Sequence, residues 1–451
     1  TAVAQVVQDQ ISLAHPYAAL VVPPIAQAVG VLHVDPQLVI MPDNERLGEF
    51  REEFAGMMGM IEERPADGPE GTAGFAGSDK IVGTYELREK LADEYDDFVD
   101  QKAFLKARLL DIYLGDWDRH ADQWRWARFK KDGKEYWRPI PRDRDQAFAK
   151  FDGLLPTLAE KRFIVPEFDG FNKEKPDIWS LTYTGRYVDR TFLNELTEDD
   201  FKKAGAEFVQ AITGELIEEA VRRLPRPIYG LSGPWIEQKL KDRRKLMARA
   251  AEDYYSNLAK IADIVGRNKS EYAEIDRVEN DRVEVKIFER DKNTGEKKGE
   301  PRYHRVFKRD ETKEIRLYLL DGNDKVVITG PAQKSIRLRI IGGPGDDEFI
   351  DESKGKTIIY DTHANTKIVK ASKAKFKSGK VDSVINAFEY EPRIPDQGKV
   401  VKPIPFFAYN SDDGIFFGAG AAFQHYGFRK TPYAGYTSIK GNVSFATGAF
   451  R

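Results

Sequence analysis

The chain has 451 residues, enough for two or three domains. Its net charge of −3, with 32% charged residues of both signs interspersed, gives no sign of nucleic-acid binding, and we predict no such partner. The absence of cysteine excludes disulfide frameworks and thiolate metal sites. No run of about 18 apolar residues predicts a membrane-spanning helix. No signal peptide is visible, and because Thr1 opens within a helical pattern we expect an upstream part.

The first part of the chain, residues 1–66, mixes helical and strand patterns. The predicted elements are helices at 3–14 and 17–29, a strand or hairpin at 31–41, and a buried strand at 54–61. Pro16 separates the two helices, because proline lacks the N–H that a helix interior needs. The buried strand leads directly into Glu62 and Glu63.

Residues 67–265 are mainly helical after a loop at 66–80 that is rich in Gly, Pro, Asp and Ser. Asp100 is predicted to cap a helix that ends at Gly115, because Asp satisfies free N–H groups at a helix start and Gly readily ends a helix. The clearest later helices are predicted at 197–223 and 234–265, the second with an apolar stripe. We expect a helical lobe packed below the acidic loops described next.

Two acidic loops carry the strongest chemical signal. Each follows a predicted buried element, and their candidate residues are Asp118, Arg119, His120 and Gln123 in the first loop and Asp143 and Asp145 in the second. Metal-assisted phosphoryl transfer needs one acid to position the attacking hydroxyl and another to hold Mg²⁺. A purely structural interpretation stays open, in which Asp118 pairs with Arg119. We predict that Trp117, Trp124 and Trp126 are packing residues.

Residues 266–370 switch to the alternation typical of strands. Alternating runs at 282–289 and 303–308 flank a polar turn, which predicts a hairpin. A repeat follows, in which Ile315-Arg-Leu-Tyr-Leu-Leu resembles Ile336-Arg-Leu-Arg-Ile-Ile. A third, more divergent copy starts at Thr357. A repeat of roughly 21 residues predicts a small parallel β-solenoid.

The end of the chain divides into a linker and a strand-forming segment. Residues 371–404 are rich in Lys and Ser and then in Pro, which predicts a linker. From 405 to 451 the composition shifts to aromatic residues, Gly and small residues. Residues 414–424 and 438–450 each match a tilted transmembrane β-strand of about 9–11 residues. Because open edges are not tolerated in lipid, we predict the first strands of a barrel that is incomplete at Arg451.

The two acidic loops also carry a family resemblance. Gly115-Asp-Trp-Asp118-Arg-His120-Ala-Asp-Gln123 resembles the catalytic loop of atypical kinases, which include phosphatidylinositol kinases, HipA-like kinases and CotH-like kinases. Arg138-Pro-Ile-Pro-Arg-Asp143-Arg-Asp145-Gln-Ala-Phe148 resembles the CotH-type segment that supplies the metal-binding aspartate. Gln123 stands where these kinases have Asn, and the chain shows no Gly-rich phosphate loop.

This resemblance implies an α+β fold with a two-lobed kinase-like domain, in which residues 1–66 are an incomplete N-lobe and 67–265 the C-lobe. It implies Mg²⁺ and a nucleotide as cofactors. The implied site residues are Asp118 as the base-like residue beside Arg119 and His120, Asp143 as the chief Mg²⁺ ligand with Asp145 and Gln123 as further metal residues, and Glu62 and Glu63 at the hinge where adenine would sit.

A second resemblance covers nearly the whole chain. The order of segments from Ala14-His-Pro-Tyr17 to Phe407-Ala-Tyr-Asn410 resembles bacterial outer-membrane surface-antigen proteins with a BamA/TamA-type barrel. This implies an outer-membrane location, a periplasmic soluble region, contact with outer-membrane lipid, and protein partners in the envelope. The implied function is a periplasm-facing kinase-like module; the alternative is a non-catalytic scaffold for outer-membrane protein assembly, secretion or surface display.

A weaker signal lies in the predicted solenoid. Gly342-Gly-Pro-Gly-Asp346-Asp347 fits the turn of calcium-binding β-rolls, in which carbonyls and carboxylates face the ion. Asp346 and Asp347 are therefore candidate Ca²⁺ ligands, and a Ca²⁺-dependent adhesion module is a third hypothesis. A plain turn is the alternative that a single copy of the motif favours.

Overall fold

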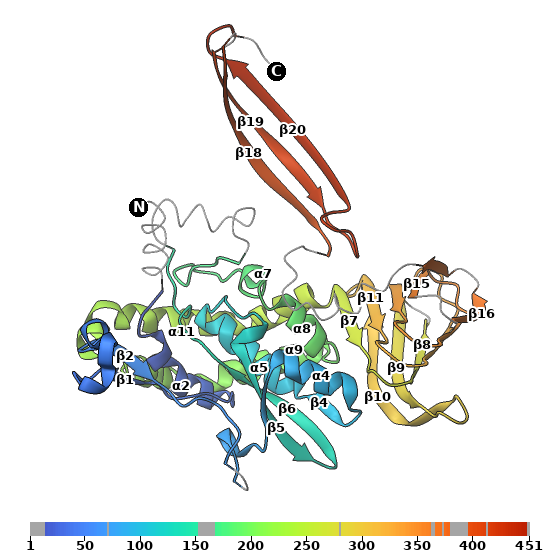
Figure 1. Cartoon of the computed structure of the whole chain (residues 1–451), viewed down its shortest axis with the longest axis horizontal. Helices are drawn as coiled ribbons and strands as arrows, with labels where there is room; N and C mark the ends of the chain where they lie inside the picture. Colours follow the sequence, from blue (N-terminus) through green and yellow to red (C-terminus); the bar gives the residue numbers. More distant parts are fainter. Residues whose placement is uncertain are drawn as a thin grey trace. The chain divides into compact units, whose positions relative to one another are not determined.

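The computed structural model of the protein describes residues 14–69, 72–151, 167–278, 281–361, 366–371, 374–378, 396–411 and 414–448. The chain is a mixed α/β protein with several separate sheets (Figure 1), and the described residues form no closed barrel. It divides into two compact units, the first of residues 1–152 and 169–390 and the second of residues 153–168 and 391–451. The helix predicted at 3–14 lies almost entirely outside the described residues.

Helices dominate the first unit as far as residue 258 (Figure 1). The α-helices are α2 (Ala18–Ala28), α3 (Arg51–Phe54), α4 (Thr84–Asp93), α5 (Gln101–Leu114), α7 (Ile178–Leu181), α8 (Arg186–Phe192), α9 (Glu198–Ala211), α10 (Gly214–Val221) and α11 (Arg226–Leu258). Short 3₁₀ turns are η1 (Glu45–Phe50), η2 (Phe75–Gly77) and η3 (Ala121–Gln123). No helix among those described is both long and apolar enough to cross a membrane.

The helix that leads to the first acidic loop begins and ends as predicted. The Asp100 side chain accepts a hydrogen bond of 3.0 Å from the N–H of Ala103 at the start of α5. Gly115 ends the helix with a φ of 69°, in the left-handed region that glycine adopts without a steric penalty. The direction of the chain into the first loop is therefore fixed at Gly115.

The prediction of a long helix at 234–265 is wrong at its C-terminal end. Helix α11 buries Leu240, Met247 and Tyr254 as the apolar stripe predicted, but it stops at Leu258. The chain then forms strand β7 (Ile261–Val265), which pairs in parallel with a later strand. A short apolar run fits both periodicities, and the neighbouring strand decides between them.

The prediction of a buried strand at 54–61 is also wrong. Strand β2 (Met58–Ile61) is shorter, and it pairs only with β1 (Gln37–Ile40) in a two-stranded antiparallel sheet. Met58 and Ile61 are 51% and 60% exposed, respectively. An apolar run alone does not secure burial, because burial needs a second layer packed on the sheet.

A four-stranded sheet carries the two acidic loops. Its strands, in the order β3-β5-β6-β4, are β3 (Ile81–Gly83), β5 (Trp124–Lys131), β6 (Lys134–Pro141) and β4 (Asp97–Val99). Trp124 and Trp126 on β5 are fully buried and pack against Phe104 of α5, which confirms their predicted packing role. The sheet is thus fixed firmly to the helix that precedes the first loop.

The second half of the first unit consists of two sheets with an apolar core between them. One sheet is parallel, in the order β17-β15-β13-β11-β7, with β11 (Glu314–Tyr318), β13 (Arg337–Ile341), β15 (Thr357–Asp361) and β17 (Lys375–Ser378). The other has the order β10-β9-β8-β12-β14-β16, with β8 (Glu271–Asp276), β9 (Arg282–Arg290), β10 (Lys297–Lys308), β12 (Lys325–Thr329), β14 (Glu348–Asp351) and β16 (Lys367–Ala371). Successive turns alternate between the sheets, as in a solenoid, and β9 and β10 form the predicted hairpin.

The second unit is a three-stranded antiparallel sheet of long strands, drawn in red in Figure 1. They are β18 (Lys399–Asn410), β19 (Gly414–His425) and β20 (Gly435–Ser444), in the order β18-β19-β20. Strand β18 begins within the stretch predicted as a linker, and β17 lies there too.

Candidate functional site

The hairpin of β5 and β6 brings the two acidic loops together. Because these antiparallel strands pair Trp124 with Pro141, the residues just before β5 lie beside those just after β6. The N–H of Arg142 donates to the carbonyl of Gln123 at 2.9 Å. The Gln123 amide then donates to the Asp143 carboxylate at 3.4 Å. Residues 20 positions apart in the sequence thus form one site.

Asp118 lies at the edge of this site beside His120. The Asp118 carboxylate is 3.9 Å from Nε2 of His120, and each side chain is about a third exposed. Burial raises the pKa of Asp118, and the negative charge of Asp143 acts in the same direction, against the opposing effect of His120 and Arg119. A carboxyl with a raised pKa beside an imidazole has the chemistry of a proton acceptor.

Asp143 and Asp145 form a close carboxyl pair. Burial raises the pKa of Asp145 to about 6, and both the charge of Asp143 and a hydrogen bond with it add to the rise. The Asp145 carboxylate also accepts a 3.0 Å hydrogen bond from the Gln146 amide. A cation bound between the two carboxylates would relieve their mutual repulsion.

The buried side chain of Arg119 forms hydrogen bonds with the backbone of both loops. Its guanidinium donates to the carbonyls of Arg142 and Asp143 at 2.7 and 2.9 Å, and to the carbonyl of Gln123 at 2.9 Å. Asp143 has a φ of 52°, in the left-handed region that non-glycine residues seldom adopt. The guanidinium therefore fixes a backbone conformation that aims the Asp143 side chain outward.

Arg119, predicted as a catalytic residue, lies deeper in the protein than its neighbours Asp118 and His120. Its side chain is fully buried, so it does not reach the exposed face where Asp143 and His120 lie. Asp118 and His120 keep accessible side chains, whereas Arg119 is a positioning residue.

A buried charge network beneath the loops was missed by sequence reasoning. Its members, all nearly or fully buried, are Arg108, Asp111, Asp116, Arg119, Arg144 and Asp189. Arg144 donates to Asp116 at 2.8 Å and also pairs with Asp111, which ties the second loop to the end of α5. Arg108 donates to both carboxylate oxygens of Asp189, at 2.8 and 3.1 Å. The available signal was the presence of Arg108 and Asp111 within the mostly apolar second half of the helix.

The pKa values of two buried aspartates in this network are shifted in opposite directions. Burial raises the pKa of Asp116, and one of its carboxylate oxygens has no hydrogen-bond partner among the described residues. Burial acts in the same way on Asp111, but Arg144, Arg119 and Arg108 together hold the pKa of Asp111 below its usual value. Three arginines and three aspartates thus lie together in the interior with little access to solvent.

Glu62 lies close to the site, and an apolar cleft lies beside it. Burial raises the pKa of Glu62, with Arg142 and Asp143 as its charged neighbours. The cleft is lined by Val22, Pro23 and Ala26 of α2, by residues 31–34, and by Pro36, Glu62, Pro141 and Arg144. Glu63, the other predicted hinge residue, is exposed.

The residues of the site fit Mg²⁺ better than they fit a closed metal centre. Among the described residues, no group of three or more His, Asp or Glu side chains is arranged to hold a metal ion. Magnesium in phosphoryl-transfer sites is commonly held by one or two carboxylates and completes its shell with phosphate and water. The pair Asp143 and Asp145, with the Gln123 amide beside it, supplies donors of this kind.

The structure places the two candidate Ca²⁺ ligands in different surroundings. Asp347 is buried and its carboxylate accepts the N–H of Asp324 at 2.9 Å, whereas Asp346 is exposed. Calcium needs six to eight oxygen ligands. The described residues at this turn include no group of three or more His, Asp or Glu side chains arranged to hold an ion.

Comparisons of the chain with protein-family models, with curated proteins and with solved structures found no match.

Proposed function

We propose that the first unit is a kinase-like module that binds a Mg²⁺–nucleotide at the two acidic loops. The observation that carries this proposal is the pairing of β5 with β6, which unites Asp118, His120 and Gln123 with Asp143 and Asp145. An accessible carboxyl of raised pKa beside a close carboxyl pair is the set of groups that phosphoryl transfer requires.

Each residue has a distinct role in this proposal. Asp143 and Asp145 would hold Mg²⁺, which neutralises phosphate charge when it is bound. Asp118 would accept the proton of the acceptor hydroxyl, and His120 would orient the Asp118 carboxylate across their 3.9 Å separation. Arg119 would keep both loops in register through its three carbonyl contacts.

The apolar cleft beside Glu62 is the place for a nucleotide base in this proposal. Its walls include Val22, Pro23 and Leu32, and Glu62 and Arg144 place polar groups on the side nearest the acidic loops. The cavity holds only about 30 Å³, so in this proposal its walls move apart to admit a base whose phosphates point toward Asp143.

Phosphate transfer from a nucleotide labelled in its terminal phosphate tests this proposal. The full chain is incubated with Mg²⁺ and an envelope extract as a source of acceptors. Asp118→Asn should abolish labelling, while Asp122→Asn, an exposed acid in the same loop, should leave it unchanged. Equal labelling by the wild-type protein and Asp118→Asn would contradict the role of Asp118.

We further propose that the second unit is the start of an outer-membrane β-barrel, so that the module faces the periplasm. The strand register supports this location. One face carries the rows Val401–Phe423–Thr437, Pro403–Ala421–Ile439, Pro405–Ala419–Gly441, Phe407–Phe417–Val443 and Tyr409–Ile415. Those rows contain no charged side chain.

The opposite face of the same sheet carries small or polar side chains at many positions. They include Lys402, Lys440, Asn442 and Ser444. An apolar face of about 9–11 residues backed by a polar face is the pattern of strands that separate lipid from a lumen. In this proposal outer-membrane lipid covers the face that exposes Phe407 and Phe417.

A non-catalytic scaffold is the second candidate function. The observation that favours it is that the Gln123 amide is directed to Asp143 at 3.4 Å, although a shorter Asn is usual at this position in the kinases that the loop resembles. As a scaffold the protein would serve outer-membrane protein assembly, secretion or surface display with envelope partners. Alanine at both Asp118 and Asp143 should then leave that cellular role intact, and its loss in a folded variant would exclude the scaffold.

A further inference from the structure

A row of buried carboxyl groups runs across the solenoid, at the corner where each turn passes from the first sheet to the second. Glu271, Asp324 and Asp347 occupy the same place in three successive turns, because their neighbours pair in register across β8, β12 and β14. Their exposed fractions are 1%, 0% and 1%. The glycine at 342 makes room for the row, since a Cβ there would collide with the carboxylates of Asp347 and Asp361.

The row is linked by hydrogen bonds that use only one oxygen of each aspartate. Asp324 accepts the N–H of Glu271 at 2.7 Å, and Asp347 accepts the N–H of Asp324 at 2.9 Å. No described residue hydrogen-bonds to the second carboxylate oxygen, Oδ2, of Asp324 or Asp347, although both oxygens are buried. A bare, buried carboxylate oxygen is costly, and a proton on it removes the charge.

The cation near the row forms its hydrogen bonds with backbone carbonyls and not with these carboxyl groups. Arg290 faces Asp324 and Asp347, but its guanidinium donates to the carbonyls of Asn323 and Gly295 at 2.8 and 3.1 Å. Among the described residues, Asp346 and Asp361 are further charged groups that act on Asp347, and both add to the negative potential.

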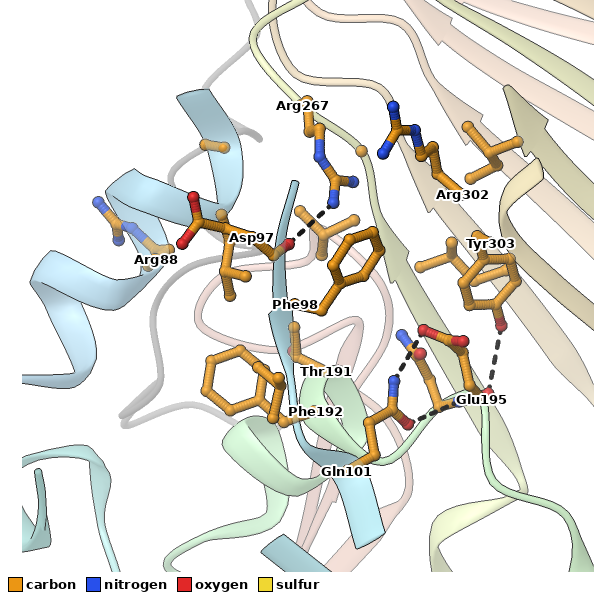
Figure 2. Close-up of a pocket in the computed structure, with 18 of the residues that line it drawn as sticks. Arg88, Asp97, Phe98, Gln101, Thr191, Phe192, Glu195, Arg267, Arg302 and Tyr303 are labelled. Atoms are coloured by element: carbon orange, nitrogen blue, oxygen red, sulfur yellow. Dashed lines mark hydrogen bonds between the residues drawn. The ribbon is translucent and has the colours of Figure 1, made fainter. Parts of the chain in front are cut away.

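The other end of the row borders a pocket between the helices and the solenoid (Figure 2). Glu271 lines this pocket together with Arg267, whose N–H donates to Glu271 at 3.1 Å. The Arg267 guanidinium itself donates to the carbonyls of Glu94 and Asp97 at 2.9 and 3.2 Å. Tyr95 also faces Glu271, and Glu289 is the cross-strand neighbour of Glu271. The pocket gives solvent protons a route to the first carboxyl.

We propose that Glu271, Asp324 and Asp347 form a proton-binding row that stabilises the solenoid when protonated and loosens it as the protons leave. Burial raises the pKa of Glu271 and of Asp347 to about 7 each, and it raises the pKa of Asp324 as well. Since an unfolded carboxyl titrates near pH ~4, the folded state holds extra protons between about pH 4 and 7. The stabilisation is therefore lost as the pH rises through this window.

Infrared spectroscopy of the full chain tests the row directly, because protonated and ionised carboxyls absorb at different frequencies. At about pH 6, where ordinary Asp and Glu are ionised, the wild-type protein should keep a protonated-carboxyl band that fades at higher pH. Asp324→Asn and Asp347→Asn should each weaken that band. Asp346→Asn, which changes the exposed neighbour in the same turn, should weaken it much less, because Asp346 is the smallest of the effects on Asp347.

Melting temperature gives the second readout. It should fall for the wild-type protein and for Asp346→Asn as the pH rises from about 6 to 8. It should fall less for Asp347→Asn, because an amide cannot lose the proton. If an aspartate variant does not fold, Glu271→Gln replaces it in both measurements. A wild-type spectrum without the band, or a band of equal strength in folded Asp324→Asn and Asp347→Asn, overturns the proposal.

Discussion

The buried guanidinium of Arg119 donates a 2.9 Å hydrogen bond to the carbonyl of Asp143, whose backbone is left-handed at a φ of 52°. This contact joins the residue that follows Asp118 to the residue that presents a carboxylate on the other loop. Because Arg119 is itself held by Asp111 and Asp116, at 3.5 Å from each, the geometry of the site depends on charges that never meet solvent.

Replacing Arg119 by Met should destabilise the protein strongly. The change leaves Asp111 and Asp116 short of a buried partner, and breaking one side of a buried ion pair typically costs about 3–5 kcal/mol. Chemical denaturation of the full chain measures the loss. Arg142→Met is the control at an exposed arginine of the second loop, with an expected change within about 0.5 kcal/mol. Similar stability of both variants would mean that Arg119 does not hold the loops.

The substitution Asp143→Gly distinguishes the effect of the Asp143 backbone conformation on stability from the role of its side chain in metal binding. Glycine adopts the left-handed region freely, so the variant should be as stable as the wild-type protein or gain up to about 1 kcal/mol. Asp132 at the tip of the same hairpin also has a φ of 52°, and Asp132→Gly is therefore the matched control. Only Asp143→Gly should lose Mg²⁺-dependent nucleotide binding, measured by calorimetry. Equal retention of binding in both variants counts against Asp143 as a metal ligand.

The affinity for Mg²⁺ should rise with pH. Asp145 carries a proton below its pKa of about 6, and the ion must displace that proton. Affinity should therefore increase between about pH 5 and 7 and then level off. Asp145→Asn should flatten this dependence as well as weaken binding, and an unchanged pH profile in that variant would remove Asp145 from the site. Titration calorimetry at several pH values supplies the measurement.

Two neighbouring positions on β20 test the lipid-facing surface. Ile439 lies on the apolar face and is 66% exposed, whereas Ser438 pairs with Ala422 on the other face. Ile439→Lys should weaken flotation of the full chain with lipid vesicles, because a lysine facing the middle of a bilayer costs about 2–4 kcal/mol. Ser438→Lys should leave flotation nearly unchanged. Equal effects of the two lysines would argue against a lipid-covered face.

Local patterns predicted some of these elements well. Asp100 and Gly115 predicted the ends of α5, and the alternation at 282–289 and 303–308 predicted the hairpin of β9 and β10. Capping and alternation act between near neighbours, so the sequence alone displays them. The solenoid repeat was visible too, but its register was not. Ile315 pairs with Leu338 and not with Ile336, because the turns between strands differ in length.

The residues of the site could be predicted from the sequence, but the burial of each side chain could not. The sequence indicated the two loops, but it could not tell that Arg119 points into the protein while its neighbours Asp118 and His120 stay accessible. Burial depends on what the rest of the chain packs over a loop. The charge network with Asp111 and Arg144 depends in the same way on contacts between distant segments, although charges in an apolar helix were a usable signal.

Calorimetric titration of a nucleotide into the full chain, with and without Mg²⁺, tests the central claim most directly. We predict binding that requires Mg²⁺, is weakened at least about tenfold by Asp143→Asn and is unchanged by Asp132→Asn at the far end of the same hairpin. An absence of binding at millimolar nucleotide, or equal affinity in the wild-type protein and Asp143→Asn, would contradict a Mg²⁺–nucleotide site at the acidic loops.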